Sequence, residues 1–74
     1  MKETARRKGK NQKVSVIIPF LNEERSIGRC IRKIQGVFKK NTIDGEIICV
    51  DSDSTDSSAK IAKSLGAVVV NQPL

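Results

Sequence analysis

The stretch Glu46-Ile47-Ile48-Cys49-Val50-Asp51-Ser52-Asp53-Ser54-Thr55-Asp56 decides the fold of this 74-residue chain. The apolar run at residues 47–50 is too short for a helix and rich in β-branched side chains, which is typical of a strand buried on both faces. Acidic residues follow it directly. Open α/β sheets bind ligands at the carboxyl ends of their parallel strands. We therefore predict that Asp51 lies at a strand end and contacts a nucleotide.

Helix and strand patterns alternate along the rest of the sequence. Residues 14–19 form a second β-branched run, which should end at Pro19 because proline cannot donate to a sheet ladder. Residues 24–40 have an apolar side and a basic side at helical spacing. A second helix at 57–65 and a third strand at 67–70 follow. This order predicts an α/β fold, strand-helix-strand-helix-strand, with three parallel strands, each beside its neighbour in sequence, and flanking helices.

Such a unit is half of a Rossmann-like, doubly wound sheet, and we expect it to be incomplete. Its first strand is apolar but would keep an unpaired edge, which predicts either missing strands or an oligomer that covers the edge. Pro73 and Leu74 close no secondary structure element. We therefore expect the chain to be a truncated N-terminal part of a longer domain.

The basic residues are concentrated at the N-terminus. The formal net charge is +6, and residues 1–13 hold six basic residues against one acidic residue, whereas residues 14–74 hold eight against seven. This predicts a flexible basic leader at 1–13 and a nearly neutral folded part at 14–74. A second interpretation is an arm that contacts anionic lipid headgroups. Nucleic acid is a less favoured partner, because no aromatic side chains for base stacking lie among these charges.

The composition excludes several kinds of site. The chain contains no histidine, which rules out His-based catalytic triads and His-liganded zinc. Cys30 and Cys49 fall inside apolar patterns and are expected to be buried and structural. The first thirteen residues lack the apolar segment of a signal peptide, and no run has the length of a membrane span. These features predict a reducing, cytoplasmic location.

Polar and acidic residues follow both of the first two predicted strands, at 22–24 and at 51–56. Because adjacent parallel strands end at the same side of a sheet, we expect the two loops to lie side by side. A carboxylate held there can accept hydrogen bonds from a base or from ribose hydroxyls, each worth about 1.5–3 kcal/mol. Asn22 is expected to cap the first helix, and Ser54, Thr55 and Asp56 to cap the second.

These two motifs together resemble the start of the family 2 nucleotide-sugar glycosyltransferases. The GT-A domain of that family opens with a strand that ends in Pro-x-x-Asn-Glu, as at residues 19–23. It continues to a strand that ends in Val-Asp-Asp-Gly-Ser-x-Asp, which is similar to residues 50–56. The resemblance covers residues 14–73. The run at 59–67 is similar to the branch that transfers sugars to polyprenyl or dolichyl phosphate.

The resemblance implies that this chain supplies part of a site for a UDP- or GDP-sugar. By position, Pro19, Leu21 and Glu23 would line the nucleoside pocket, Asp51 would bind the base, and Ser52 would lie beside it. Ser52 stands where the family usually has a second aspartate or an asparagine, and Asp53 stands where it usually has glycine. The choice between uridine and guanosine therefore stays open.

The resemblance also implies that the chemistry lies beyond residue 74. The family holds a divalent metal, Mg²⁺ or Mn²⁺, through an Asp-x-Asp motif on a later strand, so Asp51 and Asp53 are not expected to be its ligands. Inverting transfer would use a catalytic base and an acceptor site that also lie downstream. The chain alone is expected to be inactive, with no catalytic residue. A lipid-phosphate acceptor would explain the basic leader through peripheral attachment at the inner membrane face.

Two other interpretations remain open at this stage. Phosphohydrolases of the haloacid dehalogenase type carry Asp-x-Asp-x-Thr after an apolar strand, and residues 51–55 match this string. Asp51 would then be the nucleophile and Asp53 the general acid, with magnesium between them. That motif normally closes the first strand of its fold, whereas here a strand and a helix precede it. The other interpretation is a non-enzymatic nucleic-acid-binding module that uses the leader and the basic helix face.

Overall fold

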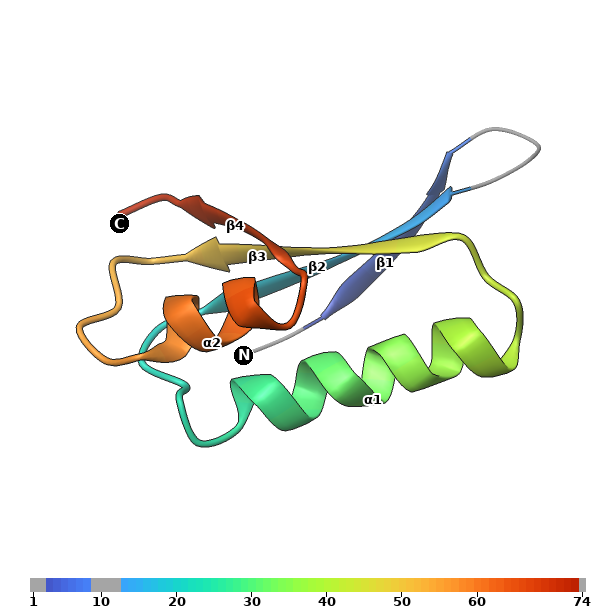
Figure 1. Cartoon of the computed structure of the whole chain (residues 1–74). Helices are drawn as coiled ribbons and strands as arrows, with labels where there is room; N and C mark the ends of the chain where they lie inside the picture. Colours follow the sequence, from blue (N-terminus) through green and yellow to red (C-terminus); the bar gives the residue numbers. More distant parts are fainter. Residues whose placement is uncertain (1–2, 9–12, 74) are drawn as a thin grey trace.

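The computed structural model describes residues 3–8 and 13–73, which form a four-stranded sheet with two helices on one of its faces (Figure 1). Strands β2, β3 and β4 are parallel, and β1 is antiparallel to β2. This confirms the predicted α/β fold and the side-by-side order of the three parallel strands. The elements in chain order are β1 (Thr4–Lys8), β2 (Lys13–Phe20), α1 (Ile27–Lys40), β3 (Gly45–Asp51), α2 (Ser58–Ser64) and β4 (Val68–Asn71).

Strand β1 differs from the sequence prediction. The charge pattern predicts a flexible leader, whereas Thr4–Lys8 pairs with β2 from Thr4 opposite Ile17 to Lys8 opposite Lys13. Backbone groups make this pairing, so a polar and basic segment can form it without an apolar pattern. The prediction of an unpaired edge on β2 is therefore wrong. Residues 1–2 and 9–12 of the predicted leader lie outside the described residues.

The core lies between the sheet and the two helices. Ile18 of β2 and Cys49 of β3 are register partners and fully buried, and Ile27 and Ile31 of α1 are fully buried against the same face. Alternate residues of a strand point to one face, while residues four apart share one side of a helix. The whole core consists of Val16, Ile18, Phe20, Ile27, Ile31, Ile47, Cys49, Ala62 and Ala67.

Helix α1 begins later than its apolar pattern predicts. The backbone carbonyl of Glu23 accepts hydrogen bonds from the N–H groups of Ser26 and Ile27, at 3.0 and 2.8 Å, so a turn precedes the helix. Ser26 occupies the N-cap position, and Asn22, predicted as the cap, lies further upstream. The bounds of α2 differ from the prediction by one residue at each end, within the usual uncertainty of helix termini.

Candidate functional site

The carboxyl ends of β2 and β3 meet at one end of the sheet, which we call the acidic rim and define as residues 21–26 and 51–57. Phe20 and Asp51 are register partners. The N–H of Ser52 donates to the carbonyl of Phe20 at 3.0 Å, so pairing continues into the loop. The two acidic loops therefore leave the sheet together, as their positions in the sequence predict.

Asn22 holds the two loops of the acidic rim together. Its backbone N–H donates to Ser54 Oγ at 2.9 Å, and its Oδ1 accepts from the N–H groups of Thr55 and Asp56, at 2.8 and 3.3 Å. Its φ of 53° lies in the left-handed region, which asparagine adopts more readily than most residues. Asn22 thus satisfies backbone donors ahead of α2 and not those of α1, so the predicted role as a cap of α1 is wrong.

Asp51 ends β3 and is a buried residue, only 4% exposed. Oδ1 accepts a hydrogen bond from the N–H of Ser54 at 2.8 Å, a local turn that fixes the orientation of the carboxylate. The backbone carbonyl of Asp51 accepts from the N–H of Gln72 at 2.8 Å, which ties this residue to the end of β4. Among the described residues, no hydrogen bond uses Oδ2.

Ser58, at the start of α2, forms hydrogen bonds with both loops of the acidic rim. It is fully buried, its Oγ accepts from the N–H of Glu23 at 2.7 Å, and it donates a short hydrogen bond to Asp56 Oδ1. Burial alone would raise the pKa of Asp56, but the hydrogen bonds from Ser58 and Glu24 outweigh it and lower this pKa. Asp56 is therefore a charged structural group. The rim is preorganised by its own side chains.

The five residues predicted to bind a nucleotide all lie at this end of the sheet, but not on one surface. Asp51 is buried on the helix side, while Glu23 and Ser52 are half-buried in the loops. Pro19 is exposed and points to the opposite face, because it lies between the core residues Ile18 and Phe20. Leu21 is 48% exposed just beyond the strand.

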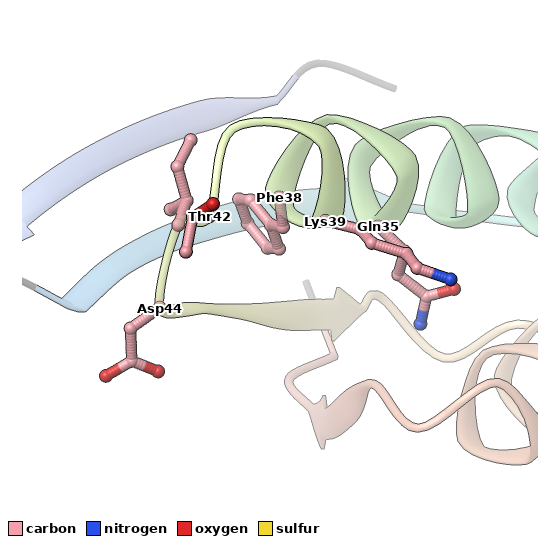
Figure 2. Close-up of a pocket in the computed structure, with 6 residues that line it drawn as sticks. Gln35, Phe38, Lys39, Thr42 and Asp44 are labelled. Atoms are coloured by element: carbon pink, nitrogen blue, oxygen red, sulfur yellow. The ribbon is translucent and has the colours of Figure 1, made fainter.

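The cavities beside α1 contain none of those five residues. One of about 600 Å³ is lined by Gln35, Phe38, Lys39, Thr42, Ile43 and Asp44 (Figure 2). It lies at the amino end of β3, roughly 20 Å along the strand from Asp51. A second, of about 530 Å³, is lined by Glu24, Arg25, Gly28, Arg29, Arg32 and Ile61. Sequence patterns gave no sign of either cavity.

Residues 3–8 and 13–73 contain no group of three acidic, cysteine or histidine side chains that could hold a metal ion. Asp51 has one oxygen bound to a backbone N–H, and Asp53 is an exposed residue with a φ of 72°. These described residues therefore provide no ligand set for the divalent metal that the resemblance implies. Neither described helix is long and apolar enough to cross a membrane.

Neither cysteine has the properties of a nucleophile. Burial raises the pKa of the Cys49 thiol to about 11. Burial also raises the pKa of Cys30 to about 11, with a further contribution from Glu3, whose Oε1 accepts a hydrogen bond from the Cys30 thiol at 3.3 Å. Thiols with such pKa values carry little thiolate at neutral pH, so both side chains act as packing groups.

Comparison with known proteins decides the family. The family model described as glycosyl transferase family 2 matches residues 15–73. The chain belongs to this family. The match includes β3, both helices, β4 and nearly all of β2, but β1 lies before it. Membership of family 2, whose members transfer glycosyl groups, replaces the phosphohydrolase and nucleic-acid-module interpretations.

Curated relatives support the same assignment. The low-salt glycan biosynthesis hexosyltransferase Agl6 of Haloferax volcanii is 40% identical over 57 residues, covering 77% of this chain and 14% of the relative. Protein RfbJ of Shigella flexneri is 39% identical over 61 residues, covering 82% and 44%. The undecaprenyl-phosphate 4-deoxy-4-formamido-L-arabinose transferase of Pseudomonas fluorescens is 38% identical over 56 residues, covering 76% and 16%. This family 2 chain thus spans less than half the length of these relatives. No solved structure matches it.

Proposed function

We propose that this chain forms the base-binding part of a nucleotide-sugar donor site. The Asp51 carboxylate is the main hydrogen-bond acceptor for the base. The observation that carries the proposal is the carboxylate of the buried residue Asp51, which is oriented by Ser54 through Oδ1 while Oδ2 accepts no hydrogen bond from the described residues. An N–H of uracil or guanine can donate to Oδ2. A hydrogen bond to a carboxylate is worth about 1.5–3 kcal/mol, and a buried site strengthens it.

The other rim residues complete the pocket. Leu21 offers exposed apolar surface against a base, while Glu23 and Ser52 offer acceptors and a donor for ribose hydroxyls. Pro19 ends β2 on the opposite face of the sheet, so its proposed part is to set the path of the loop that carries Leu21 and Glu23. The hydrogen bonds of Asn22 and Ser58 hold both loops in place before any ligand arrives. Preorganisation of this kind improves affinity, because little ordering is left to occur on binding.

The chain supplies donor binding and leaves the transfer step to residues outside it. The proposed reaction is inverting transfer from a UDP- or GDP-sugar, with the divalent metal and the catalytic base held elsewhere, and the 74 residues alone are inactive. The proposed acceptor is a lipid phosphate at the cytoplasmic face of a membrane. The relative from Pseudomonas fluorescens, named as an undecaprenyl-phosphate transferase, supports this acceptor class.

Titration of the ¹⁵N-labelled chain with UDP, GDP and their sugars, followed by NMR, tests the donor site. Part of a pocket should bind in the millimolar range, about −4 kcal/mol, and shift the amides of residues 21–23 and 51–54. Asp51→Asn should weaken binding about tenfold, because the amide replaces the charged acceptor. Asp53→Asn is the matched control and should bind as the parent does. Shifts confined to other regions, or unchanged binding by Asp51→Asn, would overturn the proposal.

A further inference from the structure

The second cavity described above, here called the arginine cavity, has a basic lining. Its volume of about 530 Å³ is within the range of small-molecule sites. Its lining consists of Glu24, Arg25, Gly28, Arg29, Arg32 and Ile61. Three basic residues against one acidic residue give a formal charge of +2. The larger cavity at the other end of α1 differs, because Lys39 and Asp44 balance each other there (Figure 2).

The spacing of the three arginines places them on one side of the helix. Arg25, in the turn before α1, is followed by Arg29 and Arg32 at intervals of four and three residues, and side chains at these intervals are neighbours on a helix surface. All three residues are exposed. Ile27 and Ile31 are fully buried against the sheet on the opposite side of α1. Packing of the helix on the core therefore holds the arginines outward as a group.

Gly28 borders the cavity where α1 comes close to α2, and both helices lie on the same face of the sheet (Figure 1). A Cβ atom at this position would lie 3.4 Å from Cγ2 of Ile61 and 3.8 Å from Cδ1 of Leu65. It would also lie 3.9 Å from Nη1 of Arg32, so this guanidinium group folds back over the glycine. The cavity thus has an apolar wall from α2 and a cationic group directed across it.

Glu24, the acidic residue of the lining, is engaged with the loop before α2. Its Oε2 accepts a hydrogen bond from the N–H of Ser57 at 3.3 Å, and its backbone N–H donates to Asp56 Oδ2 at 3.2 Å. Each guanidinium group carries five N–H donors and no acceptor. The three arginines therefore offer more donors than one carboxylate can accept, and an anion from outside the chain can accept the rest.

We propose that the arginine cavity binds a phosphate group, as carried by a phosphate monoester, through Arg25, Arg29 and Arg32. The planar fork of a guanidinium group donates two parallel hydrogen bonds to two phosphate oxygens. A phosphate monoester carries about −1.5 to −2 charges at pH 7, which matches the charge of the lining. Ile61 offers apolar contact to the rest of the molecule. The site is independent of the donor-site proposal, because none of the five residues proposed for the donor site lines it.

NMR titration of the ¹⁵N-labelled full chain with inorganic phosphate and with phenyl phosphate, at constant ionic strength, tests the site. Both should give saturable shifts of the amides of residues 25–32 and 61 in the millimolar range. Phenyl phosphate should bind more tightly, because its ring can contact Ile61. Saturation separates a site from general screening of charge, which produces shifts that grow without a limit.

The test variant is Arg32→Gln, since Arg29 also borders a smaller cavity that holds Glu3. It should weaken binding of both phosphates about tenfold, because charged hydrogen bonds are lost. Lys40→Gln is the matched control. It removes the same charge from an exposed position about 12 Å further along α1, and it should bind as the parent does. Circular dichroism reports folding. If Arg32→Gln does not fold, Arg32→Lys replaces it and should also weaken binding, because the paired donors are lost.

Vesicle flotation distinguishes the two sources of such a phosphate, a soluble ester and a lipid headgroup. Phosphatidylcholine vesicles containing phosphatidic acid, a phosphate monoester, are compared with vesicles containing the same fraction of phosphatidylglycerol, a phosphate diester. A preference for phosphatidic acid that Arg32→Gln abolishes would assign the site to a lipid headgroup. Saturable binding of the soluble phosphates without that preference would assign it to a soluble ester.

Two results would overturn the proposal. One is the absence of saturable shifts at residues 25–32 and 61 together with no preference for phosphatidic acid. The other is an equal loss of binding in Arg32→Gln and Lys40→Gln, which would show that the anion responds to the overall charge of α1 and not to the cavity.

Discussion

Both faces of the sheet carry β-branched residues, but their surroundings differ, and the face away from the helices also holds the hydrogen-bonded pair Ser15 and Glu46. On the helix face, Ile18 and Cys49 are fully buried under α1 and α2. On the face away from the helices, their chain neighbours Ile17 and Val50 are half-buried, with no described element above them. This difference shows that a run of β-branched residues predicts a strand but does not predict which face of that strand the helices cover. The burial of each residue follows from where the helices pack.

The largest expected effect comes from shortening one isoleucine on each face. Ile18→Ala should lower the free energy of unfolding by about 2–5 kcal/mol, since it leaves a cavity in a core with no exposed surface. Ile17→Ala should cost roughly 1 kcal/mol, because part of the lost side chain is already in water. Urea unfolding followed by circular dichroism measures both. Equal losses would show that the two faces are equally buried.

A second contrast uses two glycines near α1. A Cβ at Gly45 would collide with the ring of Phe38, which packs over the start of β3 (Figure 2), whereas a Cβ at Gly36 would meet nothing within 4 Å. Gly45→Ala should therefore lower the free energy of unfolding by about 1–3 kcal/mol through overpacking. Gly36→Ala should raise it by about 0.5–1 kcal/mol, because alanine favours an exposed helix position. The same urea experiment tests both changes, and a stabilised Gly45→Ala variant would contradict close packing of α1 on the sheet.

A third contrast, between Cys49 on the helix face and its alanine variant, concerns the dependence of stability on alkaline pH. The pKa of Cys49 rises from 9.0 to about 11 on folding, so its stabilisation is complete below pH 9 and is lost as the pH rises towards 11. The loss should be of order 1 kcal/mol at about pH 10 under reducing conditions. Cys49→Ala should show a flatter decline between about pH 8 and pH 10, and lysine titration is common to both proteins. Parallel curves would mean that Cys49 is not shielded from solvent.

Most of the fold could be predicted because its signals are local. β-Branched runs located β2, β3 and β4, and the spacing of apolar residues located α1. Strand β1 could not be predicted, since Thr4–Lys8 has a polar and basic sequence and is held by backbone pairing with a neighbouring strand. Patterns of side-chain polarity carry no information about such a strand.

The acidic rim was predictable in position but not in detail. Asp51 and Glu23 could be placed at strand ends, because parallel strands finish at one side of a sheet. The role of Asn22 could not be predicted, since its partners Thr55 and Asp56 are more than thirty residues away. The sequence also gave no indication that Pro19 and Asp51 would lie on opposite faces, because that depends on the register of alternation through Phe20.

The order of strands across the sheet, β1-β2-β3-β4, is the same as their order along the chain. Each strand therefore adds to an edge that already exists, and none has to insert between two others. During synthesis, which proceeds from the N-terminus at about 5–20 residues per second, the sheet could assemble one strand at a time as the chain leaves the ribosome. Each parallel strand still has to wait for the helix that precedes it, because β2 pairs with residues of β3 about thirty positions further along the chain, and non-local pairing of this kind slows folding.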